Sequence, residues 1–405
     1  MTDVPVGFQR RTVTVLVVGQ ALGGLGAGAT LAIGAVLAAE LAGEAWSGAA
    51  ATLSTLGAAA ASIPLARLAQ RWGRRWALAA GALIALGGSV LTVIAVGVGL
   101  FPVLLVAYAM LGVGTAVSLQ ARFAATDAAE PRSRGRDLSI VVWSTTVGVV
   151  VGPNLFGPGE GIATALHLPL HTGSFVIAVA AQLAATVVYL VGLRPDPLVL
   201  ARNRPVELAP QADAGIVRGR TVLVFAIGTL ALSHATMVSV MSMTPVHLTN
   251  QGADLTLVGF TISLHVAGMF AFSPLWGWAS DRMGRIPTIL TGQLLFAVSL
   301  LVLAFGERNN AAVAAGLVLL GLGWSASTVA ASALISDVVS GGARVRIQGR
   351  SDTIMSLAGA AGGALAGPVL ALVGYAGLAW IAGILVVAMI LAASVVGQRT
   401  RALRT

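Results

Sequence analysis

The chain has 405 residues, of which 57% are hydrophobic and only 10% are charged, and its mean hydropathy is +0.90. So little polar surface cannot cover a water-soluble globule of this size, so the composition predicts an integral membrane protein. A net charge of +9 would favour nucleic acid as a partner of a soluble protein, but here the arginines gather in loops between apolar stretches. No cysteine is present, which excludes disulfides and thiolate chemistry.

Twelve apolar stretches are long enough to cross a bilayer as helices, because a spanning helix needs about 20 mostly apolar residues. Runs of this length exclude a membrane β-barrel, whose strands alternate over about ten residues. We therefore expect an all-α integral membrane protein with 12 transmembrane helices, at residues 12–39, 45–66, 76–99, 102–125, 138–157, 173–194, 220–245, 254–279, 288–306, 311–336, 352–374 and 376–398. The first stretch follows Arg10-Arg11 and is too long for a signal-peptide core, so we expect a first span rather than a cleaved leader.

The arginines predict the orientation of these helices. They fall in every second connection and in both tails, whereas the alternate connections carry acids and histidines with Arg308 as the one basic exception. By the positive-inside rule, both termini are expected in the cytoplasm of a bacterium, with the chain passing many times through its cytoplasmic (inner) membrane.

The longest arginine-rich connection contains several prolines and divides the chain into two parts. We expect an N-terminal six-helix bundle at 1–194, a cytoplasmic linker at 195–219 and a C-terminal six-helix bundle at 220–405.

Two repeated motifs support this division. Residues 277–285 read Gly-Trp-Ala-Ser-Asp-Arg-Met-Gly-Arg, and an echo at 66–74 keeps Arg71, Gly73 and Arg74. The echo has Gln70 where the later copy has Asp281. The second motif is a helix-packing pattern in which Gly148-x3-Gly152-Pro153 returns as Gly363-x3-Gly367-Pro368.

Together these features resemble the major facilitator superfamily, abbreviated MFS, in its twelve-span type. The resemblance covers the whole chain in topology and is most specific at the family's gating loop, matched by Gly277, Asp281, Arg282, Gly284 and Arg285. It implies two pseudo-symmetric six-helix bundles that work by alternating access. The pattern at Gly148 is similar to part of the signature of proton-coupled exporters, although Tyr108 stands where those exporters have an arginine.

The resemblance also implies roles for the charged residues of the gating loop. Asp281 is expected near the N-terminus of the fifth span, where the positive end of the helix dipole stabilises an acid. Arg282 and Arg285 are expected to bridge to Asp337, whose counterpart in the first half is Asp127. Such contacts would bias the alternating-access equilibrium without touching substrate. The alternative is that these charges only set the topology.

Other charged residues have simpler explanations. Gln70 carries no charge, so we expect the first-half contact to be weaker and the variant Gln70→Asp to restore it. Asp137 and Asp352 are expected in the first turns of spans five and eleven. Arg122 is expected to reach the headgroups or to pair with Asp127. All 15 acids are expected in loops or at helix ends, which leaves no carboxylate in the middle of a span.

The deepest ionisable residues are His234 and His265, each about eleven residues from the outer end of its span and so roughly 16 Å deep. Trp324 lies near the same level. Histidine titrates near physiological pH, so either side chain could carry a coupled proton or donate to substrate. The alternative is a hydrogen bond that only joins helices, worth about 0.6 and at most about 2 kcal/mol.

Two methionines, Met237 and Met241, follow His234 along one helix face. Flexible methionine suits a pocket that accepts varied apolar shapes, although packing between helices is the alternative. The matching level of the first half is rich in glycine, so Gln20 is the candidate contributor from that side.

These observations predict a secondary active transporter that exports a neutral or weakly amphipathic small organic molecule in exchange for protons. The alternative within this class is uptake of a neutral nutrient, facilitated or by proton symport. A non-transporting receptor or a channel is a minor alternative, and an intramembrane enzyme lacks a deep acid or nucleophile. We expect a monomer in the lipid bilayer with a small-molecule substrate and possible protons as partners, and no metal, cofactor or nucleic acid.

Overall fold

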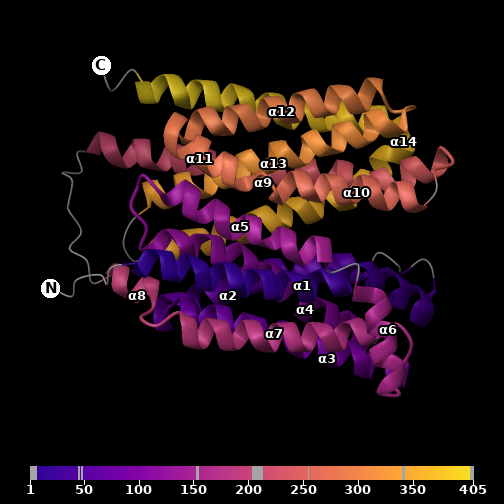
Figure 1. Ribbon diagram of the computed structural model, residues 1–405. Coiled ribbons are helices and arrows are strands. Elements are labelled where there is room, and N and C mark those ends of the chain that lie inside the picture. The colour runs from indigo at the N-terminus through magenta and orange to yellow at the C-terminus, as the bar shows by residue number, and fades with distance from the viewer. Residues whose placement is uncertain are drawn as a thin grey trace. The chain divides into compact units, whose positions relative to one another are not determined.

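The computed structural model describes residues 7–43, 46, 49–151, 155–202, 213–253, 255–339 and 343–401 of the chain. These residues form helices joined by short turns, and no strand occurs among them (Figure 1). Nine of the described helical segments are long and apolar enough to cross a membrane by length and composition. The predicted all-α fold is confirmed, while the full count of twelve spans stays a prediction.

The chain divides into two compact units. Unit 1 comprises Met1–Ala129, Ile140–Pro205 and Gly341–Thr353, and unit 2 comprises Glu130–Ser139, Val206–Ser340 and Ile354–Thr405. Each unit therefore contains one short segment from the other half of the sequence. The prediction that the bundles end at 194 and begin at 220 assigns residues 130–139 and 341–353 to the opposite units.

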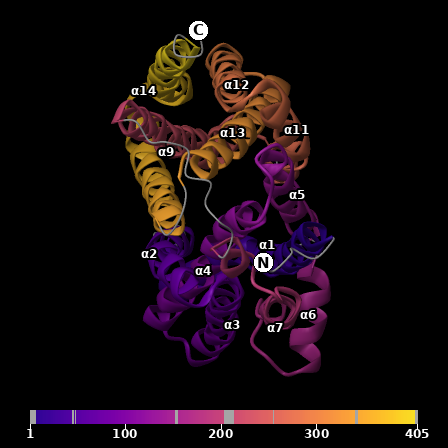
Figure 2. The ribbon, with the colours of Figure 1, turned by 90° about the vertical axis from the view of Figure 1, so that its left-hand side faces the viewer.

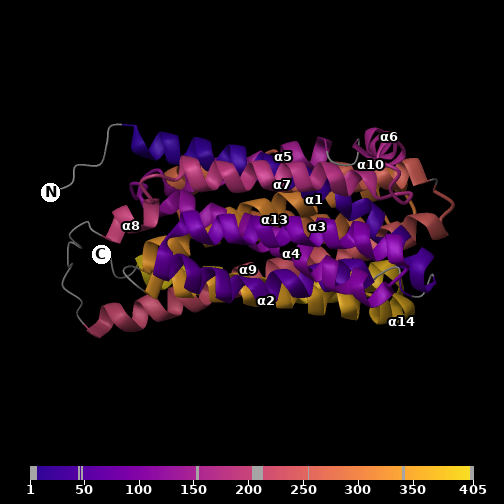
Figure 3. The same ribbon diagram turned by 90° about the horizontal axis from the view of Figure 1, so that it is seen from below.

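Unit 1 is built around α3 and α4. Its helices are α1 (Phe8–Ala42), α2 (Ala49–Trp72), α3 (Arg74–Val98), α4 (Phe101–Asp127), most of α5 (Arg134–Val151), α6 (Phe156–Ala165), α7 (Gly173–Gly192), α8 (Pro197–Arg202) and the start of α14 (Ala343–Arg401). Helix α3 packs against both α4 and α7, and α7 also runs along α1 (Figure 3). At Gly57 a Cβ atom would lie 1.9 Å from the carbonyl oxygen of Ala109, so glycine allows α2 and α4 to touch through their backbones.

Unit 2 is built around α13. Its helices are the start of α5, then α9 (Asp213–Asn250), α10 (Leu255–Phe270), α11 (Ser273–Met283), α12 (Arg285–Phe305), α13 (Asn310–Val338) and most of α14. Helix α13 packs against α9, α10, α11 and α12 (Figure 2). The side chain of Asn309 caps its N-terminus by accepting hydrogen bonds from the N–H groups of Ala311 and Ala312.

Three helix boundaries differ from the predicted spans. Helix α5 ends at Val151 and a separate helix α6 begins at Phe156, where one span to 157 was expected. Helices α10 and α11 divide the expected eighth span, with a proline in the first turn of α11. Helix α14 starts at Ala343, well before the expected 352, and consists of two helices joined at Gly374, whose φ is 72°.

Candidate functional site

Asp281 binds the N-terminus of α5 inside unit 2. Its carboxylate accepts hydrogen bonds from the backbone N–H of Gly135 at 2.9 Å and of Arg136 at 2.7 Å. Helix α5 begins at Arg134, so these N–H groups lie in its first turn, where they have no acceptor within the helix. A Cβ at Gly277 would lie 2.5 Å from the carbonyl oxygen of Gly135, so only glycine allows α11 to come this close. Asp281 therefore lies at the N-terminus of the fifth span, as the resemblance to the gating loop implies.

Arg285 joins the two acids of this region. It forms an ion pair with Asp281 and donates from Nε to Asp337 at 2.8 Å, and Arg134 binds the other oxygen of Asp337 at 2.8 Å. We call Asp281, Arg285, Asp337 and Arg134 the α5 cluster. It is partly exposed to solvent, since 28% of the Asp337 side-chain surface is accessible.

Arg282 does not make the expected bridge to Asp337. Its guanidinium lies 5.6 Å from the centre of the Trp278 ring instead. Gly284 has a φ of 102°, which suits glycine, and it forms the tight turn between α11 and α12.

The corresponding charges of unit 1 are buried. Arg74 donates from Nε to Asp127 at 2.7 Å and from Nη2 to Gln348 at 2.5 Å, and neither side chain of the ion pair exceeds 1% exposure. Gly73, with a φ of 95°, makes the turn before α3. Arg71 is exposed at the end of α2.

A second buried ion pair corrects two expectations. Arg122 pairs with Asp352 at 2.6 Å rather than with Asp127, and both side chains are at most 2% exposed. Asp352 lies well inside α14 rather than in its first turn, so one acid does lie within a helix, whereas Asp137 is in the first turn of α5 as expected. We call Arg74, Asp127, Gln348, Arg122 and Asp352 the α14 cluster.

The two helix starts also differ in register. In the echo motif, Ala66 takes the place of Gly277, and it packs against Gly349 of α14, where a Cβ would lie 2.3 Å from the Cβ of Ala66. Because α14 begins at Ala343, the N–H of Gly349 is already within the helix. Position 70 lies one turn beyond Ala66, beside the first turn of α14, so Gln70→Asp stays the test of whether an acid restores the contact.

His234 and Trp324 meet at a hydrogen bond between α9 and α13. Trp324 Nε1 lies 3.1 Å from His234 Nδ1. Because an indole N–H only donates, Nδ1 is the acceptor and the neutral imidazole carries its proton on Nε2. A Cβ at Gly359 would lie 2.4 Å from His234 Cδ2, so α14 leaves room for the ring by having glycine there. Met237 is buried on α9, and Met241 is half-buried one turn further on.

His265 has a different environment. It is completely buried on α10, and its Nδ1 lies 2.7 Å from the carbonyl oxygen of Leu317 on α13. Its Nε2 has no hydrogen-bond partner among the described residues. The ring joins two helices of unit 2, which is the structural alternative considered from the sequence.

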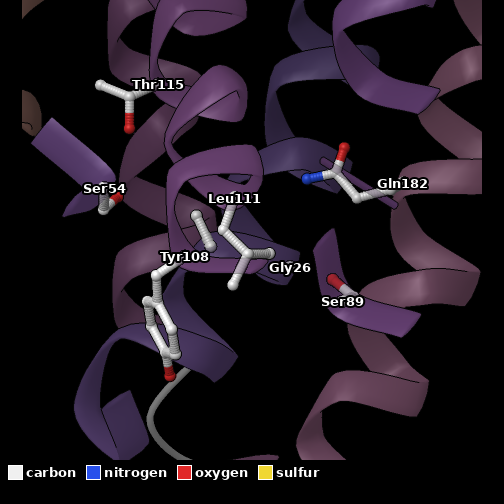
Figure 4. A pocket seen from close by; sticks show the side chains of 8 residues that line it. Gly26, Ser54, Ser89, Tyr108, Leu111, Thr115 and Gln182 are labelled. Carbon is white, nitrogen blue, oxygen red and sulfur yellow. The ribbon is translucent and has the colours of Figure 1, made fainter. Parts of the chain in front are cut away.

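A small cavity of about 30 Å³ lies inside unit 1, with room for a few water molecules at most (Figure 4). Its walls carry neutral polar side chains from four helices, Ser54, Ser89, Tyr108, Thr115 and Gln182, and are completed by Gly26, Ala27 and Leu111. The amide nitrogen of Gln182 occupies space near Gly26 and Gly114, where Cβ atoms would lie 3.3 and 3.7 Å away. The buried hydroxyl of Tyr108 has no partner within the described part of the chain.

The sequence profile of the Major Facilitator Superfamily matches residues 16–252 and 224–404. The chain belongs to the Major Facilitator Superfamily. It is 36% identical to the uncharacterized MFS-type transporter YdeG of Bacillus subtilis (strain 168), over 93% of this chain and 89% of that protein. It is 28% identical to the riboflavin transporter RfnT of Brucella anthropi (strain ATCC 49188), over 94% of each chain.

Solved structures give the same fold. The crystal structure of the human organic anion transporter MFSD10 (TETRAN) superposes with a TM-score of 0.76 at 16% identity, covering 96% of this chain and 100% of that one. The predicted family and MFS fold are therefore confirmed. The chain is a multi-pass membrane protein of a transporter family, and such transporters bind small-molecule substrates.

Each unit of this MFS chain has a buried glutamine that forms hydrogen bonds to side chains of neighbouring helices. Gln20 donates to Ser118 Oγ at 2.7 Å and accepts from the Tyr189 hydroxyl at 3.5 Å. Gln293, which sequence reasoning did not select, donates to Ser233 Oγ at 2.8 Å and to Ser327 Oγ at 3.0 Å. A glutamine in the middle of an apolar stretch was the available signal for Gln293, as it was for Gln182.

The repeated glycines of the MFS fold have unequal surroundings here. A Cβ at Gly148 would lie 2.0 Å from the backbone of Gly24, so α5 and α1 touch at this point. A Cβ at Gly363 would only contact Val238 at 3.3 Å, and one at Gly367 would meet nothing within 4 Å. Pro368 lies inside α14. Gly152 and Pro153 lie outside the described residues.

Proposed function

We propose that this chain is a secondary active transporter that exports a neutral or weakly amphipathic small organic molecule in exchange for protons. The observation that carries the proposal is that the candidate binding groups are uncharged. The donors and acceptors around the unit 1 cavity are hydroxyls and an amide, and those near Trp324 are an imidazole, hydroxyls and the Gln293 amide.

The buried charges of the α14 cluster support this substrate class, because each of them already lies against an opposite charge. Arg74 pairs with Asp127, and Arg122 pairs with Asp352. Removing one partner from such a pair leaves an uncompensated buried charge, so these groups are poor ligands for an ionic substrate.

His234 is the proposed site of proton coupling. Its Nδ1 accepts the Trp324 hydrogen bond only while that nitrogen carries no proton. Protonation at Nδ1 therefore breaks this hydrogen bond between α9 and α13 and frees the indole N–H. Proton binding and the His234–Trp324 contact exclude each other, which links the charge of the ring to the position of a large side chain.

Transport in proteoliposomes tests the proposal, with riboflavin as the first probe. An acidic lumen should drive accumulation if protons leave as the molecule enters, which is exchange; an acidic exterior should drive it if the two move together. His234→Ala should abolish gradient-driven accumulation and leave counterflow exchange, and the control His265→Asn should keep the gradient dependence. A normal proton dependence in His234→Ala would exclude His234 as the coupling residue.

Uptake of a neutral nutrient is the second candidate function. It is favoured by the 28% identity over 94% of the chain to a riboflavin transporter. The direction of the effective proton gradient in the same proteoliposome experiment separates this candidate from export.

The α5 cluster is the proposed gating contact. Asp281 holds the start of α5 against α11 through two N–H groups, and Arg285 connects this contact to Asp337 on α13. Breaking it requires the four partly exposed charges of the cluster to separate, and water can solvate them when they do. Two residues next to the cluster complete the gating loop. Arg282 lies over the Trp278 ring of α11, and Gly284 forms the turn between α11 and α12.

We further propose that the chain lies in the inner membrane of a bacterium, as a monomer with both termini in the cytoplasm. Because the sequence has no cysteine, single cysteines report their side of the membrane without background. A membrane-impermeant maleimide should label a cysteine placed at the exposed Thr249 in intact cells. One at the exposed Glu130 should be labelled only after the cells are opened, and the opposite pattern would reverse the proposed topology.

A further inference from the structure

One corner of unit 1, where α2 ends and α3 begins, combines exposed arginine with exposed tryptophan. Trp72 is 66% exposed and Trp76 is 46% exposed. Arg67 and Arg71 are also exposed, one helical turn apart on the same face of α2. Tryptophan prefers the headgroup level of a bilayer, so this corner has the composition of a surface that meets lipid headgroups.

Two more arginines reach the same corner. The Arg75 guanidinium lies 4.7 Å from the centre of the Trp76 ring, and its Nε is buried without a hydrogen-bond partner among the described residues. Arg202 of α8 donates to the backbone carbonyl of Gln70 at 2.6 Å. Arg75 is only half-buried, so the end of its guanidinium, rather than the buried Nε, is the part that can donate to an anion.

Carboxylates do not balance this positive charge. Asp196 is the acid beside the turn, but it accepts from the backbone N–H of Arg75 at 2.7 Å and of Leu198 at 2.9 Å. Over the described ranges, Arg67, Arg71, Arg75 and Arg202 form no ion pair with a carboxylate.

The corresponding corner of unit 2 has fewer arginines, because Trp278 and Ile286 stand at the positions of Arg67 and Arg75. It also has an acid, Asp281, where the unit 1 motif has Gln70. The corner of unit 1 therefore has a surplus of guanidinium groups next to exposed aromatic rings.

We propose that this corner, formed by Arg67, Arg71, Arg75, Arg202, Trp72 and Trp76, binds the phosphate of an anionic phospholipid. Guanidinium groups bind phosphate through charge-assisted hydrogen bonds, and the tryptophans pack against the glycerol and upper acyl region. Each arginine at a charged membrane surface strengthens binding by about fivefold. The proposal does not depend on the transported substrate.

Native mass spectrometry of the purified full chain tests the site with dioleoyl phosphatidylglycerol and dioleoyl phosphatidylcholine as probes. The wild type should retain phosphatidylglycerol preferentially. Arg67→Gln combined with Arg71→Gln should lower that preference by about fivefold per arginine. Gln70→Asp should lower it too, because the new carboxylate competes with phosphate, and Arg282→Gln in unit 2 is the matched control that should keep it.

A thermal-unfolding series checks that each variant is folded and separates the possible anions. Phosphatidylglycerol should raise the unfolding temperature of the wild type more than phosphatidylcholine does, and millimolar inorganic phosphate should not replace it. Equal retention of the two lipids by the wild type overturns the proposal. So does an unchanged preference in the folded double variant, or full replacement of the lipid effect by inorganic phosphate.

Discussion

The α5 cluster and the α14 cluster occupy equivalent places in the repeated sequence, yet they hold a helix start in different ways. In the α5 cluster an acid on α11 binds free N–H groups at the first turn of α5. In the α14 cluster the helix starts earlier, and its side chains Gln348 and Asp352 bind arginines of α3 and α4. The repeat thus preserves the location of the contact while the chemistry changes from helix-end recognition to buried ion pairing.

The difference in burial has an energetic consequence. Asp337 is 28% exposed, whereas Asp352 has no exposed side-chain surface. Charges that keep access to water separate at a small cost, but charges buried as a pair cannot be separated or neutralised one at a time without a large penalty. The α5 cluster is therefore suited to repeated opening, and the α14 cluster to holding unit 1 together.

The largest effect is expected from Asp352→Asn. The change leaves the buried guanidinium of Arg122 without its counter-charge and should lower the free energy of unfolding by about 3 to 5 kcal/mol. Thermal unfolding in detergent measures it. The double variant Arg122→Met with Asp352→Leu should be more stable than either single variant, and a wild-type unfolding temperature for Asp352→Asn would mean that the pair contributes nothing.

An intermediate effect is expected from Asp281→Asn, which removes the charge and keeps one oxygen, enough for only one of the two N–H groups of Gly135 and Arg136. The contact should weaken by about 1 to 2 kcal/mol, because the acid interacts with the helix dipole and with Arg285. A cysteine in place of Ser139, which is buried against Gly277, should then be labelled roughly 5 to 30 times faster.

The control for this experiment is a cysteine in place of the exposed Glu130, whose labelling rate should be the same with and without the Asp281 change. If the cysteine at position 139 reacts equally fast in both backgrounds, Asp281 does not hold α5 against α11.

The smallest effect is expected from Gln70→Asp. Gln70 is half-buried at the end of α2 among exposed arginines, so the new acid gains mainly solvent-exposed ion pairs and should change the free energy of unfolding by less than about 0.5 kcal/mol. Thermal unfolding should give nearly the wild-type midpoint. A gain comparable to the loss in Asp281→Asn would show that the two clusters are interchangeable after all.

The gating loop could be predicted from sequence because its information is local. The spacing of Gly277, Asp281, Gly284 and Arg285 indicates a helix end, an acid and a tight turn within nine residues. The long-range steps, from Asp281 to the start of α5 and from Arg285 to Asp337, were implied by the resemblance to the family's gating loop, and the first also agrees with the attraction between an acid and a helix N-terminus. Arg282 was expected to share Asp337 with Arg285, but its guanidinium lies over the Trp278 ring instead.

The α14 cluster was missed because the beginning of α14 is not apolar. Residues 343–351 include three arginines, so a search for apolar stretches starts the span at Asp352, nine residues late. That shift makes a buried acid look like a helix-start acid. The cavity around the Gln182 amide and the Tyr108 hydroxyl was missed for another reason: its lining residues come from five separate helices, and their spacing along the sequence does not show that they lie together.

The exchange of short segments between the two compact units has a consequence for taking the protein apart. Unit 1 needs residues 341–353 and unit 2 needs residues 130–139, so a cut in the 195–219 linker gives two fragments, neither of which contains a whole unit. Each fragment would lack a segment that packs in its own unit and would carry a segment that packs in the other unit. We therefore expect neither fragment to fold alone and the two fragments to fold together when they are co-expressed, because the exchanged segments join them without the linker.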